Sequence, residues 1–265
     1  MHSSDAGARA DLAQIAAAVL ERLRARGPRV HCITNAVAQN FTGNVLLAAG
    51  AVPSMTLSSN EIGAFVARSN ALLVNLGTFD RERREATVIA IEAAAKDHVP
   101  WVLDPVFVDR SASRALFARD LVALAPQVVR LNHAEFSALT GNEPTCAAVS
   151  AYARERKTVV GLSGETDLVC DGARAGMIEN GHPLMAKVTA MGCAASALIA
   201  ACLGVEPDAW RGTVAGLLIV GVAGELAAAK SQGPGSFAVA ILDELHNLDG
   251  QTLVTHARTE LEKAT

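Results

Sequence analysis

Residues 189–200 read TAMGCAASALIA, and the predicted fold can be built outward from this stretch. The preceding Lys187-Val188-Thr189 is expected to be extended, whereas the residues after Gly192 are mostly good helix formers. The pattern predicts a loop that turns into a buried helix, with the loop amides gathered at the helix N-terminus. Such a terminus carries about half a positive charge and several free N–H groups, so it can hold an anion such as a phosphate group. Cys193 would lie in the first helical turn, where the same field favours a thiolate over a thiol.

The same stretch is also compatible with a purely structural role. A Gly-Cys-Ala-Ala sequence at the start of an apolar helix often serves close packing, with cysteine as a small hydrophobic residue. A helix N-terminus permits anion binding but does not require it. The choice between an anion site and simple packing therefore depends on the rest of the chain.

The composition favours a single large α/β domain spanning residues 1–265. Hydrophobic residues make up 51% of the chain, which is enough for a large buried core. Aromatic residues make up only 4%, so stacking platforms for single-stranded nucleic acid are not expected. The formal net charge is −4, and no basic tract is present to neutralise a nucleic-acid backbone or an anionic membrane. Neither nucleic acid nor a membrane is therefore expected as a partner.

The cysteines and the first residues favour a reducing, cytoplasmic location. The chain has 5 cysteines, an odd number, and no C-x-x-C pair, which argues against both a disulfide framework and a zinc site. No basic region followed by an apolar core marks the N-terminus as a secretory signal. The longest apolar run, Val214 to Gly224, is too short to span a bilayer.

Strand and helix patterns alternate along the chain without a linker. Apolar runs predict strands at 30–33, 52–56, 71–75, 101–105, 128–131 and 158–162. Helical spacing predicts helices at 11–26, 40–49, 58–68, 81–97, 134–139, 147–156, 208–229 and 237–248. Ser58 and Glu61 are expected to form a capping box, residues 167–178 a hairpin, and the last residues a short helix. The alternation predicts one doubly wound α/β domain with a mainly parallel central sheet flanked by helices.

Polar side chains follow the predicted strands at the edge where such folds bind ligands. They are Thr34 and Asn35, Asn75, Asp104, Asn132 with Glu135, and Ser163 with Glu165. The carboxylates of Asp104 and Glu135 beside an anion site would suit Mg²⁺, which prefers oxygen ligands and keeps several waters. Asp104 could instead cap a turn, and Glu135 could complement a helix dipole. His31 lies within a strand without a Ser or Cys partner, so a structural role is expected for it.

Several familiar signatures are missing from the sequence. It contains no G-x-x-x-x-G-K-[ST] phosphate loop and no G-x-G-x-x-G after a strand. It also lacks a G-x-S-x-G hydrolase elbow and the protein-kinase signature set. An anion site, if present, must therefore be built differently from these motifs.

Taken together, the stretches resemble the hydroxyethylthiazole kinases, ribokinase-like enzymes of thiamine salvage. No single short motif decides the resemblance, which rests on an ordered series covering nearly the whole chain after the first helix. The series comprises residues 31–35, 40–42, 46–55, 73–78, 103–106, 130–135, 163–167, 187–189, 192–193 and 233–237.

The resemblance implies phosphorylation of the hydroxyl of 4-methyl-5-(2-hydroxyethyl)thiazole with ATP and Mg²⁺, in a homotrimer with its sites at subunit boundaries. By matched position, the thiazole would contact Asn35, Met55 and Ala190. ATP would contact Arg130, Asn132, Ser163 and Gly192. Asp104 and Glu135 would organise Mg²⁺. Cys193 stands where most ribokinase-like enzymes have an aspartate base, and cysteine there distinguishes thiazole kinases from pyrimidine and pyridoxal kinases.

One residue departs from the family pattern. The family loop usually reads Thr-Gly-x-Gly-Cys, and Ala190 replaces its first glycine. Alanine would be strained if this position needs a positive φ, and tolerated if it only needs a small side chain. Two alternatives remain open: a kinase for a related alcohol, hydroxymethylpyrimidine or pyridoxal, and a non-catalytic protein that binds thiazole or nucleotide.

Overall fold

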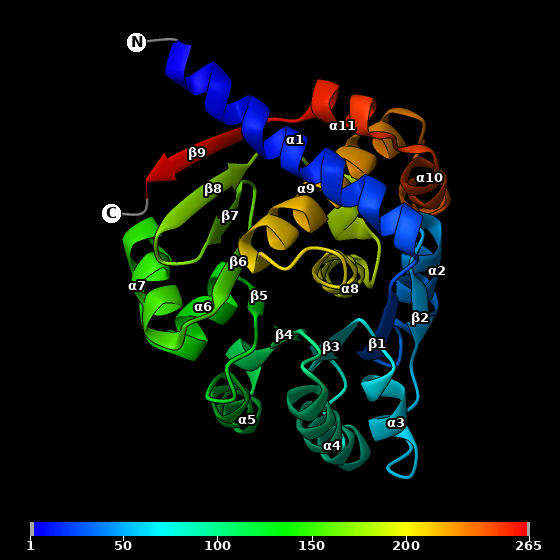
Figure 1. Cartoon of the computed structure of the whole chain (residues 1–265), viewed down its shortest axis with the longest axis vertical. Helices are drawn as coiled ribbons and strands as arrows, with labels where there is room; N and C mark the ends of the chain where they lie inside the picture. The colour runs from blue at the N-terminus through cyan, green and yellow to red at the C-terminus, as the bar shows by residue number, and fades with distance from the viewer. Residues whose placement is uncertain (1–2, 264–265) are drawn as a thin grey trace.

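One nine-stranded sheet, ordered β2-β1-β3-β4-β5-β6-β7-β8-β9, forms the centre of the molecule (Figure 1). The computed structural model describes the backbone of residues 3–263 and the side chains of residues 12–261. Six strands run parallel: β1 (Arg29–Ile33), β2 (Val52–Ser54), β3 (Ala71–Asn75), β4 (Trp101–Asp104), β5 (Val128–Asn132) and β6 (Val159–Ser163). Three antiparallel strands extend the sheet: β7 (Asp167–Cys170), β8 (Arg174–Ile178) and β9 (Thr259–Lys263).

Helices cover both faces of the sheet, as the sequence predicts. One face carries α1 (Ser3–Arg26), α2 (Gln39–Ala49), α8 (Met191–Leu203), α9 (Ala209–Ala229), α10 (Pro234–Asn247) and α11 (Gly250–His256). The other face carries α3 (Ile62–Ala67), α4 (Arg81–Asp97), α5 (Ala112–Val122), α6 (His133–Thr140) and α7 (Cys146–Arg156). Two 3₁₀ helices, η1 (Val108–Arg110) and η2 (Pro183–Lys187), lie in loops. Each face has its own apolar core, which confirms the doubly wound α/β class.

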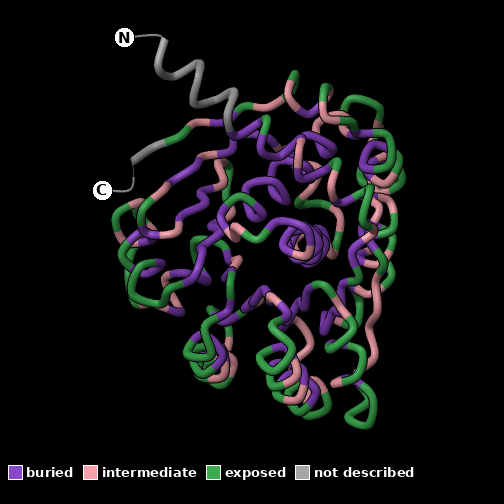
Figure 2. The backbone as a smooth tube through the Cα atoms, in the orientation of Figure 1, coloured by how far each residue is buried: buried purple, intermediate pink, exposed green. Residues whose placement is uncertain are grey.

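The first core is organised around two apolar helices, α8 and α9. Nearly every residue of α8 is buried, and its tube in Figure 2 is coloured accordingly. Among the described residues, only α9 is long and apolar enough to cross a membrane, and 78% of its most apolar window is buried inside the protein. Its apolar surface therefore packs against the sheet and the neighbouring helices.

The strand register gathers the predicted polar residues at one edge. Asn75 on β3 is paired with Asp104 on β4, and Asn132 on β5 with Ser163 on β6. Because these strands are parallel, their carboxyl ends meet at the same edge of the sheet. The expected convergence of these side chains is confirmed.

The structure differs from the local expectations at the start of α3, in part of the lead-in to α8 and near the C-terminus, and it contains helix α5, which was not predicted. The capping box at Ser58 does not form, because α3 begins at Ile62 and Glu61 instead accepts a hydrogen bond from the Thr56 hydroxyl. In the lead-in to α8, which is expected to be extended, Lys187 lies in η2, whereas Val188 is extended, with φ −110° and ψ 119°. The short helix expected near the end of the chain corresponds to α11, but the last described residues form strand β9, which the sequence pattern does not predict. The sequence of β9, TELEK, is rich in charge, as is common at a sheet edge, and gives little apolar signal.

Candidate active site

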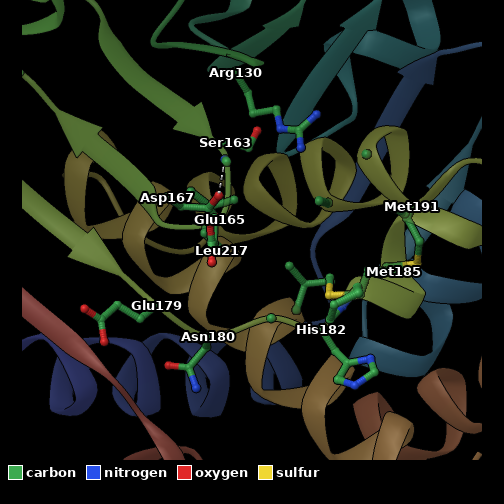
Figure 3. Close-up of a pocket in the computed structure, with 17 residues that line it drawn as sticks. Arg130, Ser163, Glu165, Asp167, Glu179, Asn180, His182, Met185, Met191 and Leu217 are labelled. Atoms are coloured by element: carbon green, nitrogen blue, oxygen red, sulfur yellow. Dashed lines mark hydrogen bonds between the residues drawn. The ribbon is translucent and has the colours of Figure 1, made fainter. Parts of the chain in front are cut away.

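A pocket of ≈ 630 Å³ lies at the carboxyl ends of β5 and β6, beside the N-terminus of α8 (Figure 3). Three residues that the sequence assigns to ATP line it: Arg130, Ser163 and Gly192. Arg130 and Ser163 come from strand ends, and Gly192 from the first turn of α8. The pocket thus joins the sheet edge to the helix terminus that the sequence singled out.

Ala190 precedes α8 in the left-handed conformation, with φ 73° and ψ −3°. The carbonyl of Ala190 accepts the hydrogen bond of the Ala194 amide, so the residue is the last one before the helical turns. Alanine has a Cβ atom that clashes in this region of φ/ψ space, at a cost of about 1–2 kcal/mol. The loop therefore needs a positive φ at the position where glycine is replaced, and Ala190 adopts it under strain.

The guanidinium of Arg130 packs against the helix terminus. A Cβ atom added to Gly192 would lie 3.0 Å from Nη1 of Arg130, so glycine leaves room for this approach. The Nε of Arg130 is buried and has no hydrogen-bond partner among the described residues. A cation beside the positive end of a helix is unfavourable unless an anion lies between them. The geometry therefore favours an anion in this part of the pocket, and disfavours the purely structural interpretation of α8.

Asp104 is fully buried at the end of β4, in contact with two hydrogen-bond donors. Its Oδ2 accepts from Nδ2 of Asn75 at 2.7 Å and from Oγ of Ser196 at 2.8 Å. Its Oδ1 is buried without a partner among the described residues. Burial is the main cause that raises the pKa of Asp104 to about 6; the charge on Arg130 opposes this increase and the charge on Glu135 adds to it. One oxygen of this carboxylate therefore has no hydrogen-bond donor among the described residues, and the side chain has no exposed surface.

Cys193 lies beside Asp104 but is not a thiolate. Its Sγ is 3.3 Å from Nδ2 of Asn75, the same nitrogen that donates to Asp104. Burial, together with the negative charge of Asp104, raises the pKa of the Cys193 thiol to about 12. The expectation of a thiolate is wrong, because burial beside a carboxylate outweighs the field of the helix.

Glu135 is tied to two backbone amides. Asn132 and Glu135 form a capping box at the start of α6, in which Oδ1 of Asn132 accepts from the Glu135 amide and Oε2 of Glu135 accepts from the Asn132 amide. Oε1 of Glu135 accepts from the amide of Phe107, in the loop after β4. The capping box gives Asn132 a structural role, and Asn132 is not among the residues that line the pocket.

Asp104 and Glu135 can supply the one or two carboxylates that Mg²⁺ commonly uses, but not a cage of three or more protein ligands. Among the described residues, no cluster of three or more His, Cys, Asp or Glu side chains is arranged to hold a metal ion. Mg²⁺ is commonly bound by one or two carboxylates together with waters and substrate phosphates. The unpartnered Oδ1 of Asp104 meets this requirement, and Glu135 is near enough to raise the pKa of Asp104.

Asn35 and Met55 do not line the pocket. Asp104, Glu135, Cys193 and Ala190 are also outside its lining, although Ala190 and Cys193 flank the lining residues Met191 and Gly192. Oδ1 of Asn35 accepts from the Thr78 hydroxyl at 3.1 Å, and the side chain packs against Gly77. Met55 is partly buried against the first core, beside Gly43. Both residues follow the ends of the neighbouring strands β1 and β2, away from the lining of the pocket.

His31 has the structural role expected of it. Its Nδ1 lies 2.8 Å from Oγ of Ser54 and its Nε2 lies 3.1 Å from the carbonyl of Thr56. Burial lowers the pKa of His31 to about 4, so the ring is neutral at physiological pH. Both ring nitrogens thus have partners on the next strand and its loop.

Sequence reasoning missed two parts of the site. Ser196 lies within the opening stretch, where a single serine in an alanine-rich apolar helix was a usable signal. The segment 179–185, which forms one side of the pocket, offered no signal because its turns depend on contacts with α9. Asn75 was recognised only as a strand end.

The fold and the site define a ribokinase-like α/β protein. A ribokinase-like protein of Enterococcus faecalis matches the fold with a TM-score of 0.67 over 86% of this chain and 89% of its own, at 12% identity. The sequence narrows the class: residues 20–251 match the hydroxyethylthiazole kinase family, and the chain belongs to that family. A probable hydroxyethylthiazole kinase of Agrobacterium fabrum is 44% identical over 248 residues, covering 94% of this chain and 96% of the relative. The structure of the hydroxyethylthiazole kinase from Pyrococcus horikoshii OT3 matches with a TM-score of 0.90 and 34% identity, over 94% of this chain and 99% of that one.

Proposed function

We propose that this protein transfers the γ-phosphoryl group of ATP to the hydroxyl of 4-methyl-5-(2-hydroxyethyl)thiazole, in thiamine biosynthesis or salvage. Family membership supports the reaction. The observation that carries the assignment to this pocket is that the guanidinium of Arg130 and the N-terminal turn of α8 line it together, with Nη1 of Arg130 3.0 Å from a Cβ atom placed on Gly192. Both features attract the negative charge of a nucleotide phosphate.

The residues of the pocket and those beside it would act by positioning and by stabilising charge. Phosphoryl transfer passes through a loose transition state, so these two effects supply most of the catalysis. The amides from Ala190 to Cys193 and the guanidinium of Arg130 would stabilise charge on the transferred group, with Ser163 contacting ATP. The neutral thiol of Cys193 would orient the substrate hydroxyl by hydrogen bonding, since its raised pKa leaves little thiolate to remove the proton. Asn35 and Met55 would contact the thiazole ring.

Mg²⁺ would be held through Asp104 and Glu135. When bound, it neutralises part of the negative charge of the phosphates. Oδ1 of Asp104 supports this assignment because it is the carboxylate oxygen without a hydrogen bond among the described residues. Asn75 and Ser196 would keep the other oxygen occupied and so hold the carboxylate in one orientation.

A homotrimer with thiazole sites at subunit boundaries is part of the same proposal. Several apolar side chains are exposed on one flank of the molecule: Val37 is 70% exposed, Leu47 58% and Val52 49%. They lie in or beside α2 and β2, next to Asn35 and Met55 (Figure 1). A neighbouring subunit on this flank would cover these side chains and complete the thiazole site. The odd number of cysteines and the lack of a C-x-x-C pair support a cytoplasmic location.

A turnover assay tests the proposed function against its alternatives. Purified protein with ATP and Mg²⁺ is offered the thiazole alcohol, hydroxymethylpyrimidine or pyridoxal in parallel, and the phosphate esters are detected by mass spectrometry. The proposal predicts that the thiazole ester forms fastest. Faster conversion of another alcohol would reassign the substrate, and tight thiazole binding without ADP release would indicate a non-catalytic binding protein.

A further inference from the structure

One side of the pocket is formed by residues 179–185, which we call the pocket wall. It lies opposite Arg130 and Ser163, as Figure 3 shows for Asn180, His182 and Met185. The wall rests directly on α9. A Cβ atom added to Gly221 would lie 2.6 Å from the carbonyl oxygen of Asn180, and one added to Gly224 would lie 2.6 Å from Sδ of Met185. The depth of the pocket is therefore set by how the wall is seated on this helix.

Glu225 fixes the start of the pocket wall from α9. Its Oε1 accepts from the amide of Gly181 at 2.8 Å, and its Oε2 accepts from Nδ2 of Asn180 at 3.1 Å. Both carboxylate oxygens also accept from the guanidinium of Arg258, with Nη1 2.9 Å from Oε2. Glu225 itself is not among the residues that line the pocket, so it acts on the pocket through Asn180 and Gly181.

Arg258 connects the C-terminal segment to the same wall. Its backbone amide donates to Oδ1 of Asn180 at 2.7 Å, and its Nη2 donates to the carbonyl of Glu179 at 2.7 Å. Asn180 is buried, and Nδ2 of its side chain also donates to the carbonyl of His256 at 2.9 Å. Both the oxygen and the nitrogen of the Asn180 side-chain amide are therefore hydrogen-bonded. Arg258 lies beyond residues 20–251, the part of the chain that matches the family.

We propose that Glu225 and Arg258 form a latch that positions the pocket wall for nucleotide binding. The inference rests on the proposed function in one respect, that the ≈ 630 Å³ pocket takes a nucleoside triphosphate. Neither residue touches the pocket interior, so both are positioning residues. Replacing Glu225 weakens the hydrogen bonds that hold Asn180 and Gly181 to α9, and replacing Arg258 removes the guanidinium that holds Glu225 and the Glu179 carbonyl. In both cases the nucleotide must restore the position of the pocket wall as it binds. Nucleotide affinity falls, whereas the thiazole site at the ends of β1 and β2 is unaffected.

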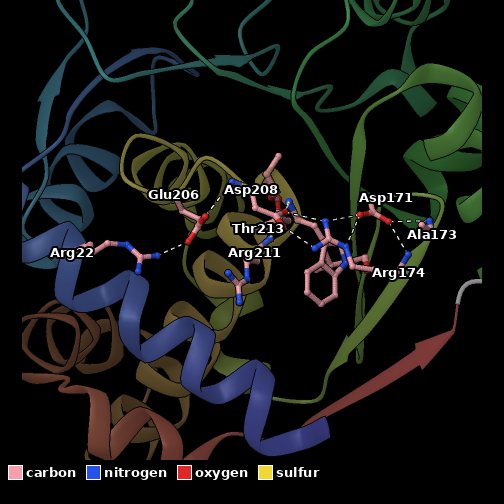
Figure 4. Close-up of polar contacts among 11 residues, drawn as sticks. Arg22, Asp171, Ala173, Arg174, Glu206, Asp208, Arg211 and Thr213 are labelled. Carbon is pink, nitrogen blue, oxygen red and sulfur yellow. Dashed lines mark hydrogen bonds and ion pairs between the residues drawn. The ribbon is translucent and has the colours of Figure 1, made fainter.

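An equally exposed ion pair elsewhere provides a matched control. Arg174 pairs with Asp208 at 2.7 Å and with Asp171, at the opposite end of β8 from the pocket wall (Figure 4). The side chain of Arg174 is 43% exposed, against 50% for Arg258. Arg174→Met and Arg258→Met therefore each remove one bidentate guanidinium, at opposite ends of β8. A stability loss common to both variants reports only on the fold.

The experiment measures nucleotide affinity and turnover in full-length Glu225→Gln, Arg258→Met, Arg258→Lys and Arg174→Met. We expect the KM for ATP to rise roughly three- to tenfold in Glu225→Gln and Arg258→Met, with kcat and the KM for thiazole alcohol unchanged, because one charge-assisted hydrogen-bond cluster is lost. Arg258→Lys should recover part of the effect, and Arg174→Met should show none. The Kd for ATP, measured by calorimetry without thiazole, should rise by a similar factor to the KM for ATP.

The outcomes separate the latch from the proposed function. An unchanged Kd for ATP in both latch variants would overturn the latch, whether or not the wild-type protein turns over. The same increase in Arg174→Met would also overturn it, because the effect would then follow stability and not position. Wild-type protein that binds ATP but makes no ester would contradict the proposed function, and the calorimetric comparison would still decide the latch.

Discussion

The side-chain amide of Asn75 donates to the carboxylate of Asp104 over 2.7 Å, across the ends of the neighbouring strands β3 and β4. The same nitrogen lies 3.3 Å from Sγ of Cys193. One amide therefore fixes both the carboxylate assigned to Mg²⁺ and the thiol assigned to the substrate hydroxyl. This contact joins two elements that are far apart in the sequence, β3 and α8.

Replacing Asn75 with alanine should weaken both Mg²⁺ binding and turnover. Groups that orient metal ligands typically contribute about 10- to 100-fold to metal affinity or activity, and we expect a loss in this range. The measurement is kcat as a function of Mg²⁺ concentration. Ser196→Ala is the matched control for the contact with the thiol. Ser196 donates to the same oxygen of Asp104 but is not bonded to the Cys193 thiol, so its replacement should affect turnover only through Asp104. If Asn75→Ala kept the wild-type Mg²⁺ dependence, the positioning role would be wrong.

Asp104→Asn should stabilise the Mg²⁺-free protein while abolishing most turnover. Burial raises the pKa of Asp104 from 3.8 to about 6, so between these pH values the folded protein binds a proton that the unfolded chain has released. Above pH 6 the buried carboxylate is charged and destabilises the fold, by about 1–3 kcal/mol as an order of magnitude. Denaturant unfolding at pH 7 without Mg²⁺ should therefore give a larger free energy of unfolding for Asp104→Asn than for the wild type.

The pH dependence of that difference provides its control. The gap between Asp104→Asn and the wild type should shrink as the pH falls from about 6 and vanish below about 4, where Asp104 is protonated in both states. A wild-type protein more stable than Asp104→Asn at pH 7 without Mg²⁺ would contradict the assignment of a buried, destabilising charge.

Cys193 should behave as a neutral thiol throughout the working pH range. Its pKa is raised to about 12, so the profile of kcat against pH should show no titration from this group between about pH 7 and 9. Cys193→Asp should stay active, because a carboxylate retains an acceptor at this position. We expect Cys193→Ala to lose about tenfold in kcat, the scale of one hydrogen bond. A Cys193→Ala protein with an unchanged rate would show that the thiol has no role in the reaction.

Ala190→Gly should raise stability by about 1 kcal/mol, because glycine adopts a positive φ without the clash of a Cβ atom. For a chain of this size, that corresponds to a rise in Tm of about 2–4 °C. Ala125 also has a positive φ, 54°, so Ala125→Gly is a control far from the phosphate-binding loop. Both variants should be stabilised, and only Ala190→Gly should change kcat. A lower Tm for Ala190→Gly would mean that the strain is not present in solution.

The layered fold and the polar edge of the sheet were predictable because both follow from local patterns. Apolar runs such as 71–75 indicate buried parallel strands, and their carboxyl ends share an edge in any such sheet. Asp104 and Glu135 could therefore be placed near one another before any coordinates, whereas Arg130 was assigned only through the family resemblance. The sequence also predicts that Ala190 is strained if its φ is positive, and the observed φ of 73° meets that condition.

The remaining features depend on contacts between distant segments. The protonation state of Cys193 is set by how deeply α8 is buried and by its distance from Asp104, neither of which the sequence displays. The pocket wall depends on the close approach of Asn180 to Gly221 on α9. Strand β9 is recognisable only once β8 offers it an unpaired edge. Helix propensity and hydrophobic spacing carry no information on these relationships.

The central claim is that Arg130 and the N-terminus of α8 hold the phosphates of ATP during transfer to the thiazole alcohol. The most direct test compares ester formation by wild-type protein and Arg130→Met, with ATP and Mg²⁺, by ³¹P NMR. We predict one ADP for each thiazole phosphate in the wild type, and a rate about 10²- to 10³-fold lower in Arg130→Met, the scale for losing one charge-stabilising group. Ester formation at the wild-type rate in Arg130→Met would contradict the claim.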